Sequence, residues 1–574
     1  MPTRGRRAVS SVRSWGKAVK PRRADLKRDL LAAMPSAIAA VPDGMASGVL
    51  AGVNPVQGLY ASLVGRVAGG LTTSTKMMVI TTTSAAALAA GSAVEGTPDA
   101  ERSDAVLWLA LIAGAVIILA GAFGLSRYVR FVSRSVMLGF LTGLSANILF
   151  GQLPALAGSP AEGSFPLTKA LHVVLSPALI NVPSLLAGLT AILLLATLSR
   201  TRASSIASLV ALLVPTATVM LIGVPGVATV ADLGAIPRGL PIPHLPSPAA
   251  LDPSVISGAL AVAAIIVVQG SGVAEAAPNP DGSLSHSRQD FRAQGIANLA
   301  AGLFGGQPVG GSVGATALNV SVGARSRWAA ILSGVGVGLV LALFSTAVGL
   351  VLLPTLAAFL IYAAVMSFKP AEVWSVAHAG LTSWMALTVT LVATLLLPVA
   401  AAVGIGVAIS LVLQLNQEAV DLRVVELYPT SEGQFAERPP PVTLSDDSVV
   451  VLDVYGSLFF AGAKTLQHEL PLVGPAQNVS VVLRLRGRTT LGLTFLSVVS
   501  DYSDRLQKNE GRLYLTGLDP AVLKRWESDA LTRRLTGVLL YPATDIVGAA
   551  THEAVLDAQA RLRDRGLGPA VGEE

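Results

Sequence analysis

The chain of 574 residues contains no cysteine, which excludes disulfide bonds, thiol catalysis and cysteine-ligated metal sites. Charged residues are also scarce, at 13% of the chain, where soluble proteins carry about 25%. The six histidines lie far apart without the spacing of metal ligands, so we expect neither a zinc or iron enzyme nor any other cofactor. Hydrophobic residues make up 52% of the chain, and with so few charges its mean hydropathy of +0.64 predicts a protein with many membrane spans.

Residues 1–28 form a basic arm that supplies much of the net charge of +6. Next to a first membrane span, such an arm holds the N-terminus in the cytoplasm. Contact with anionic lipid is a second role for it. No folded basic module follows the arm, so we expect no nucleic-acid partner.

The rest of the chain divides by composition. We predict a membrane domain at 29–417 with fourteen hydrophobic segments, a Pro-rich linker at 418–444, a soluble domain at 445–566 and a tail at 567–574. Lys and Arg fall mostly in the loops that this count places inside, and Arg66 serves as a marker for the inside turn between the second and third spans. The even count also leaves the C-terminal domain in the cytoplasm.

The C-terminal part alternates strand and helix patterns. Apolar runs at 449–454, 479–483 and 512–516 predict buried strands, and the pattern at 495–506 predicts a helix. The segment has no phosphate-binding loop and no dinucleotide motif, so nothing in it indicates nucleotide chemistry. We therefore expect a small α/β domain.

Two short segments interrupt the apolar regions of the membrane domain. The first contains Thr81, Thr82, Thr83 and Ser84, and the second is the Gly-rich segment 310–316. Each falls in the third hydrophobic segment of its half of the membrane domain. Two broken helices at matching positions point to the central binding site of a transporter, and their free N–H groups suit a small anion. Close helix packing by small residues is the alternative explanation.

Asp43 lies within an apolar span. A carboxylate inside the bilayer is costly and is therefore a functional candidate. A carboxyl group in an apolar environment also holds a proton more readily than one in water, so we expect Asp43 to carry a proton. The alternative is that the span starts later and Asp43 lies among the lipid headgroups.

Several motifs, in this order, resemble those of the sulfate permease (SulP) family of anion transporters. They are Pro42-Asp43-Gly44-Met45-Ala46 with the segment 51–60, Gly139-Phe140-Leu141-Thr142-Gly143, the GxIPxGLP stretch at 234–241, Gln294-Gly295-Ile296-Ala297-Asn298 with Gly305-Gly306-Gln307-Pro308, and Gly456-Ser457-Leu458-Phe459-Phe460-Ala461 at the start of a STAS-like domain. The resemblance covers nearly the whole chain after residue 29.

The resemblance implies an all-α membrane domain of two inverted seven-span repeats, followed by a cytoplasmic α/β STAS domain. It also implies an anion site lined by spans one, three, eight and ten. Carried onto this chain, the substrate-binding residues are Asp43, Thr82, Thr83, Ser84, Gln269, Gly314, Ala315 and Thr316. Asp43 and Glu275 are the residues expected to couple transport to an ion gradient. For Glu275, a solvated helix end is the alternative. Gln269 has a helix-linking hydrogen bond as its alternative.

The chain departs from the family pattern at three positions. Asp43 stands where the family usually has Gln, and Gln269 where it has an acidic residue. Ala315 stands where many members carry Arg, and Gly314-Ala315-Thr316 resembles the sodium-coupled bicarbonate branch. That branch pairs Asp with Thr in span eight, whereas this chain has Gln269 and Val273, so a sodium site of that kind is not expected.

These observations predict a secondary active anion transporter and not an enzyme. Sulfate is the first substrate candidate, with bicarbonate or a dicarboxylate as alternatives. A membrane-anchored STAS regulator and a nucleobase carrier of the same fold are the alternative functions. We expect a homodimer in the plasma membrane, with both termini cytoplasmic and a regulatory partner at the STAS domain. Thr494 matches a phosphorylated position of STAS relatives but lacks the preceding Asp.

Overall fold

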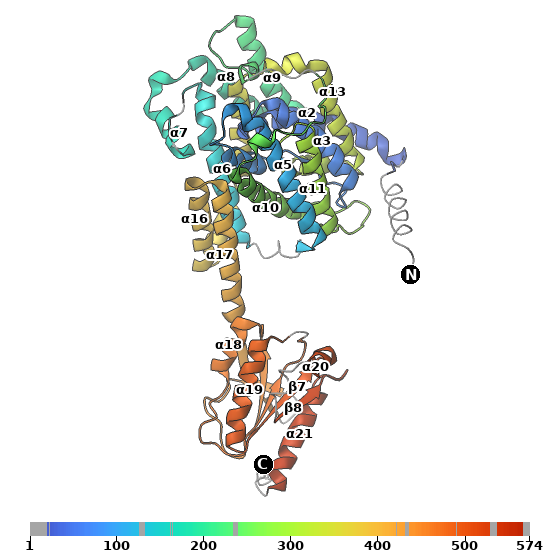
Figure 1. Ribbon diagram of the computed structural model, residues 1–574, viewed down its shortest axis with the longest axis vertical. Helices are drawn as coiled ribbons and strands as arrows, with labels where there is room; N and C mark the ends of the chain where they lie inside the picture. Colours follow the sequence, from blue (N-terminus) through green and yellow to red (C-terminus); the bar gives the residue numbers. More distant parts are fainter. Residues whose placement is uncertain are drawn as a thin grey trace. The chain divides into compact units, whose positions relative to one another are not determined.

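A computed structural model describes residues 20–21, 23–125, 133–160, 162–163, 165–201, 203–233, 239–420, 422–430, 435–488, 491–527 and 537–565. Most of the predicted basic arm, residues 234–238 of the GxIPxGLP stretch and the predicted tail lie outside these residues. The chain divides into two compact units, Met1–Ser410 and Leu411–Glu574 (Figure 1).

The first unit is almost entirely helical. Its first half contains α2 (Arg23–Leu50), α3 (Pro55–Thr72), β1 (Ile80–Thr81), α4 (Ser84–Ala93), α5 (Asp99–Ala122), α6 (Arg134–Ala157), α7 (Pro166–Leu175), α8 (Val182–Leu198) and α9 (Ala207–Ile222). Its second half contains α10 (Pro253–Ala276), α11 (Ser287–Leu303), β2 (Gly310–Gly311), α12 (Val313–Ser321), α13 (Trp328–Gly349), α14 (Leu353–Ser367), α15 (Pro370–His378), α16 (Leu381–Leu396) and α17 (Val399–Val420). Short 3₁₀ turns connect some of them: η2 (Pro177–Leu179), η3 (Ser204–Ile206), η4 (Val230–Leu233) and η5 (Pro248–Ala250).

The two halves repeat one helix order in inverted form. Apart from the extra short helices α7 and α15, each described half holds seven helices, and the third is short and follows a two-residue strand. The packing repeats as well. α5 packs on α11 as α13 packs on α3, and α6 packs on α16 as α14 packs on α8. The predicted fourteen-segment, inverted-repeat fold is therefore confirmed.

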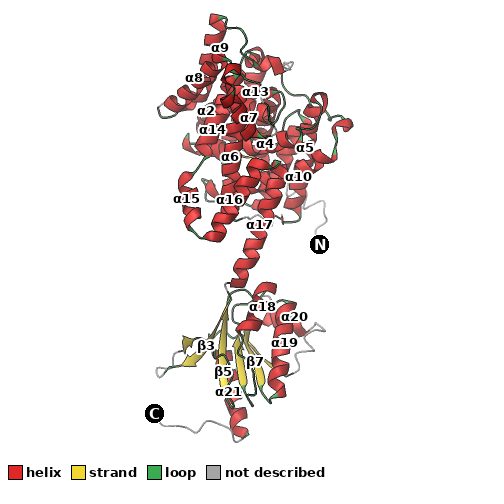
Figure 2. Cartoon of the chain, turned by 90° about the vertical axis from the view of Figure 1, so that its left-hand side faces the viewer, coloured by secondary structure: helices red, strands yellow, loops and turns green. Residues whose placement is uncertain are grey.

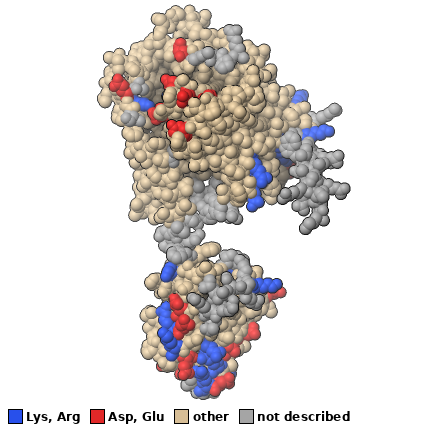
Figure 3. Space-filling model, viewed as in Figure 1, with Lys and Arg blue, Asp and Glu red and all other residues tan. Residues whose placement is uncertain are grey.

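The helices of this unit suit a lipid environment. Within the described residues, six helices are long and apolar enough to cross a membrane, and six shorter apolar helices accompany them. The face of this unit visible in Figure 3 carries few charged side chains, whereas the visible face of the second unit carries many of both signs. The first unit is thus a multi-pass membrane domain.

Small residues let the first two helices approach closely. A Cβ atom added to Gly58 of α3 would lie only 1.8 Å from the carbonyl oxygen of Gly44 in α2. Contacts of this kind between small residues are typical of packing in membranes, where van der Waals contact replaces the hydrophobic effect. They fix α2 firmly on α3.

The second unit is an α/β domain (Figure 2). Its elements are β3 (Arg423–Pro429), β4 (Phe435–Arg438), β5 (Val449–Tyr455), α18 (Phe460–Glu469), β6 (Ser480–Arg484), α19 (Leu493–Lys508), β7 (Arg512–Leu518), α20 (Pro520–Glu527), β8 (Val538–Pro542) and α21 (Ala549–Asp564). The sheet order is β4-β3-β5-β6-β7-β8, with β5 to β8 parallel and β3 and β4 antiparallel. The three predicted strands and the predicted helix are all present.

The predicted linker at 418–444 is not a simple connection. It contains β3 and β4, which belong to the sheet of the C-terminal domain, because Arg423 to Leu427 of β3 pair antiparallel with β5 and β4 pairs with β3. Burial of Val424 and Val425 holds β3 in place. The prolines that follow Arg438 end β4, because proline cannot donate to a strand ladder.

Candidate functional site

The two interrupted segments meet in a short antiparallel ladder. Ile80 of β1 pairs with Gly311 of β2, and Thr81 pairs with Gly310. The contact extends past the strands, because the Ser312 N–H donates to the Val79 carbonyl at 2.9 Å. The Val79 N–H donates in turn to the Thr316 hydroxyl at 3.0 Å. The ladder thus joins the third spans of the two halves through their backbones.

Each half-helix begins directly after its strand. Thr83 caps α4 by accepting a hydrogen bond from the Ala86 N–H at 3.2 Å, and Ser312 caps α12 by accepting one from the Ala315 N–H at 3.2 Å. Hydroxyl side chains at N-cap positions satisfy only one of the free donors of a helix start. Among the described residues, no acceptor reaches the backbone N–H groups of Ser84, Ala85, Val313 and Gly314.

Buried amides of α11 hold the second strand. The Asn298 side chain donates to the Val309 carbonyl at 2.6 Å and accepts from the Val309 N–H at 2.9 Å. The Gln294 side-chain oxygen accepts from the Gly311 N–H at 3.2 Å. Both side chains are fully buried. Gln294 and Asn298 lie in a stretch that the sequence marked by resemblance, and here they fix the position of β2.

The hydroxyl groups near α4 divide into two kinds. Thr81 donates to Ser62 of α3 at 3.1 Å, and the hydroxyls of Ser62 and Thr82 share a hydrogen bond of 3.2 Å. These groups anchor β1 to α3. Ser84 is half-buried, and its hydroxyl has no hydrogen-bond partner among the described residues. Of the predicted hydroxyls, Ser84 is therefore the freest to bind a ligand, whereas Thr316 already accepts from Val79.

A cavity of about 320 Å³ lies beside the two helix starts. Ala85 and Val313 line it from α4 and α12, and Gln269 lines it from α10. The side-chain oxygen of Gln269 is buried and has no hydrogen-bond partner within the described chain. Lys369 also lines the cavity. The space is ample for a small anion with some water, because a water molecule occupies about 30 Å³ in the liquid.

Asp43 lies inside the packed helices of the membrane domain. Its neighbours Met45 and Ala46 are fully buried, so a position among the headgroups does not describe it. A Cβ atom added at Gly44 would lie 3.0 Å from the Ser62 hydroxyl, which places this turn of α2 beside the residues that anchor β1. The Asp43 carboxylate has no hydrogen-bond partner among the described residues.

Glu275 stands apart from the other predicted residues. It is exposed in the last turn of α10 and does not line the cavity beside the helix starts. Its position fits the solvated helix end that was the alternative interpretation of Glu275. The structure therefore brings together the two helix starts and Gln269 but not Glu275.

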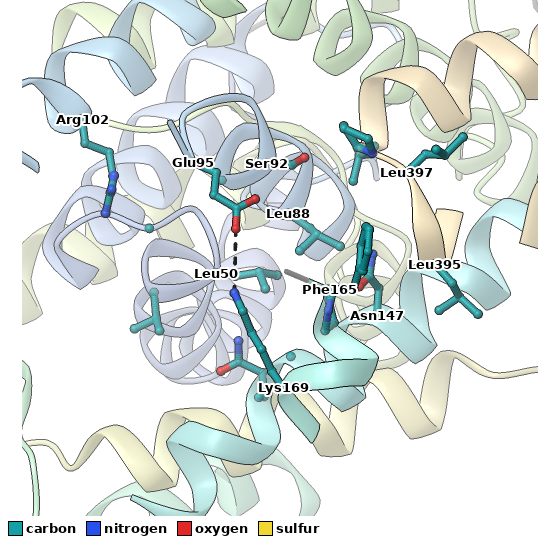
Figure 4. Close-up of a pocket in the computed structure, with 18 residues that line it drawn as sticks. Leu50, Leu88, Ser92, Glu95, Arg102, Asn147, Phe165, Lys169, Leu395 and Leu397 are labelled. Carbon is teal, nitrogen blue, oxygen red and sulfur yellow. Dashed lines mark ion pairs between the residues drawn. The ribbon is translucent and has the colours of Figure 1, made fainter. Parts of the chain in front are cut away.

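A second cavity, of about 380 Å³, lies at the other end of α4 (Figure 4). Leu88 and Ser92 of α4 line it together with Asn147 of α6. In Figure 4 the side chains of Glu95 and Lys169 point toward one another across this cavity, and they form an ion pair of 3.8 Å. Because Lys169 belongs to α7, the pair links two different walls.

Arg66 is not at an inside turn, so that prediction was wrong. It lies within α3, is 2% exposed, and donates to the hydroxyls of Ser36 and Ser333 at 2.9 Å each. The turn between α3 and β1 carries Lys76 instead, which pairs with Asp281. The serines that bind Arg66 lie far away in sequence, so the chain alone gave no signal for its burial.

The inverted repeats, the two half-helices and the ladder between them form the arrangement of a membrane transporter. The chain matches the family described as "Sulfate permease family" over residues 26–391. It therefore belongs to that family of anion transporters and is not an enzyme, as the motifs predicted.

Curated relatives of known name match over most of their length. The chain is 26% identical to the protein described as "Putative sulfate transporter YvdB" of Bacillus subtilis, over 86% of this chain and 91% of that protein. It is 24% identical to the bicarbonate transporter BicA of Synechocystis, over 88% of this chain and 90% of that protein.

Solved structures share the fold. The structure of SLC26A9 matches with a TM-score of 0.81 at 18% identity and covers 95% of this chain and 92% of that one. The transmembrane domain of BicA matches with a TM-score of 0.58 at 22% identity, over 67% of this chain and 99% of that one. The first match extends over the C-terminal α/β domain, whose fold agrees with the predicted STAS domain.

Proposed function

We propose that this protein carries a small anion across the membrane by alternating access, with sulfate as the first candidate and bicarbonate or a dicarboxylate as alternatives. The observation that carries the proposal is the pair of helix starts joined by β1 and β2. Their four free N–H groups offer hydrogen bonds and partial positive charge to an anion. In this proposal the anion binds between Ser84 and the first turn of α12, against Gly314 and Ala315.

The polar groups around the helix starts complete the proposed site. Gln269 faces the same cavity as Ala85 and Val313, so its amide can turn a donor toward the anion. Thr82 and Thr83 hold the start of α4 in position through Ser62 and the N-cap bond. Thr316 holds the start of α12 through Val79.

Asp43 is the proposed proton carrier. Its carboxylate is half-buried without a hydrogen-bond partner among the described residues, and a neutral carboxyl group tolerates such a place better than a charged one. Anion entry favours the protonated form, because the carboxylate and the anion repel each other. Proton and anion therefore move together in this proposal.

The proposed function also implies a membrane location, an oligomeric state and an orientation. We place the protein in the plasma membrane as a homodimer, with both termini in the cytoplasm. The C-terminal domain then faces cytoplasmic regulatory partners. Its exposed charges of both signs suit a solvated domain.

Uptake of radiolabelled sulfate into proteoliposomes tests the proposal. We expect accumulation when the outside is more acidic than the inside, no dependence on sodium, and competition by bicarbonate or succinate according to the true substrate. Competition by uracil alone would indicate a nucleobase carrier. Absence of uptake for every anion in the panel would favour a membrane-anchored regulator and contradict the proposal.

A further inference from the structure

Four charged side chains of the described membrane domain are more than nine-tenths buried: Asp29, Arg66, Asp290 and Arg327. Asp29 accepts from the backbone N–H groups of the segment after α12. Asp290 accepts from backbone and hydroxyl groups of the turn after α3. Arg327 donates to carbonyl groups at the end of α3. Three of the four thus pair with helix ends or turns at the edges of the bundle.

Arg66 differs from the other three. Its partners are the hydroxyls of Ser36 in α2 and Ser333 in α13, and its Nε atom is buried without a hydrogen-bond partner. A charge taken out of water is costly unless an opposite charge offsets it. Serine hydroxyls supply no charge, so the offset must come from a carboxylate nearby.

Asp43 is the carboxylate that lies on the same face of α2 as Ser36, the hydrogen-bond partner of Arg66. Ser36 and Asp43 are seven residues apart in α2, which is about two turns, so both face the same side of the helix about 10 Å apart. Because Arg66 donates to Ser36, its guanidinium lies against the same side of α2 as Asp43. α2 also packs on α4, α9, α12 and α13, which carry no titratable side chain, and on α14, which carries Tyr362. α3 adds Tyr60 besides Arg66.

Arg66 also lies close to the half-helix starts. Ser62 precedes it by four residues in α3, and such residues are neighbours on one face of a helix. Ser62 shares a hydrogen bond with Thr82, which precedes the N-cap Thr83 of α4. The backbone of Arg66 is therefore about one helix turn away from Ser62, which anchors the strand that leads into α4.

We propose that Arg66 is the fixed positive charge of the anion site, that it replaces the cation missing at position 315, and that Asp43 masks it. The inference rests on the proposed function and adds a residue that determines affinity and pH dependence. With Asp43 ionised, the two charges cancel. When Asp43 takes a proton from the solution, the charge of Arg66 is uncovered and attracts the anion. Release of the proton restores the cancellation and expels the anion.

The expected size of the effect follows from Coulomb's law. We take about 10 Å, the separation of Ser36 from Asp43 along α2, as the distance between the Arg66 guanidinium and the anion. At this distance and an effective dielectric constant of about 20, the charge of Arg66 changes the affinity about 15-fold for each unit of anion charge. For the divalent sulfate ion we therefore expect at least a tenfold loss of affinity in Arg66→Met at acidic pH. The same loss of charge should move the midpoint of the affinity-against-pH curve upward by about one pH unit, because the Asp43 carboxylate loses its stabilising cation.

The experiment measures sulfate binding to the purified full chain from acidic to neutral pH. Arg66→Lys keeps the charge and Ser333→Ala keeps the arginine, so both should retain the wild-type midpoint. A purely structural role for Arg66 would lower the yield of folded protein in Arg66→Met without moving the midpoint. An unmoved midpoint together with unchanged affinity in folded Arg66→Met would overturn the inference.

The double variant Asp43→Asn/Arg66→Met covers the case in which Arg66→Met alone does not fold. It removes both charges at once and so leaves no unpaired charge in the interior. It should bind sulfate at least tenfold more weakly than Asp43→Asn at every pH, and equal affinity would overturn the role of Arg66. If the wild-type chain binds sulfate and transports it, that result leaves the proposed function standing. If the wild-type chain binds no anion of the panel, the proposed function fails and this inference fails with it.

Discussion

Gly314 offers the sharpest test of the site, because a substitution there should raise stability while lowering transport. A Cβ atom added to Gly314 meets no atom within 4 Å, so alanine fits without strain. Replacing glycine by alanine at a compatible position stabilises a protein by about 0.4–1 kcal/mol. The same methyl group, however, stands beside the free N–H groups at the start of α12, where we place the anion.

The loss of transport can be sized from the helix end. An interaction with a helix terminus is worth about 0.3–2 kcal/mol, so its loss in Gly314→Ala should raise the KM for sulfate by about 2- to 30-fold. Gly314→Leu should abolish uptake. Proteoliposome uptake gives KM, and thermal unfolding in detergent gives the stability.

Gly404 provides the matched control for Gly314. It is also in a helix, also has no atom within 4 Å of an added Cβ atom, and does not line the cavity beside the helix starts. Gly404→Ala should therefore stabilise the protein without changing KM. Unchanged uptake in both Gly314→Ala and Gly314→Leu would show that the anion does not bind at the start of α12.

Three further predictions test the same arrangement. Ala315→Leu should block sulfate uptake at normal expression, and normal uptake would place the site elsewhere. Asp43→Asn should still bind sulfate but lose accumulation driven by a pH gradient, whereas unchanged pH-driven accumulation would exclude Asp43 from coupling. The chain has no cysteine, so a reducible bifunctional thiol reagent on Glu95→Cys/Lys169→Cys should stop uptake until reductant is added, because it ties the turn after α4 to α7. Uptake that persists in the cross-linked protein would show that these two walls do not move apart during transport.

The sequence predicted the half-helices because their signals are local. Hydroxyl residues and glycines interrupt apolar runs at matching places. The pairing of β1 with β2 could not be predicted from the sequence, because a strand of two residues is too short to show the alternating pattern of polar and apolar residues that marks a strand. Their register depends on Gln294 and Asn298 of another helix.

The role of Arg66 could not be predicted for a different physical reason. An arginine near a span boundary and an arginine inside a bundle look alike in sequence, since hydropathy records only the residue type. The two kinds of arginine differ in whether the fold brings hydrogen-bond partners to the guanidinium. Ser36 and Ser333 lie 30 and 267 residues away from Arg66, and nothing in the local pattern marks either serine as a partner.

The shortness of α4 has a consequence for biogenesis. With 10 residues, it is about 15 Å long, half of the roughly 30 Å hydrocarbon core of a bilayer, so it cannot cross the membrane by itself. Its entry strand is held by Gly310 and Gly311 of β2, and Thr316 bonds to Val79 from 237 residues further along the chain. During synthesis, the third span of the first half must therefore wait, incompletely inserted and sheltered by its neighbours or by the insertion machinery, until the first three spans of the second half have left the ribosome.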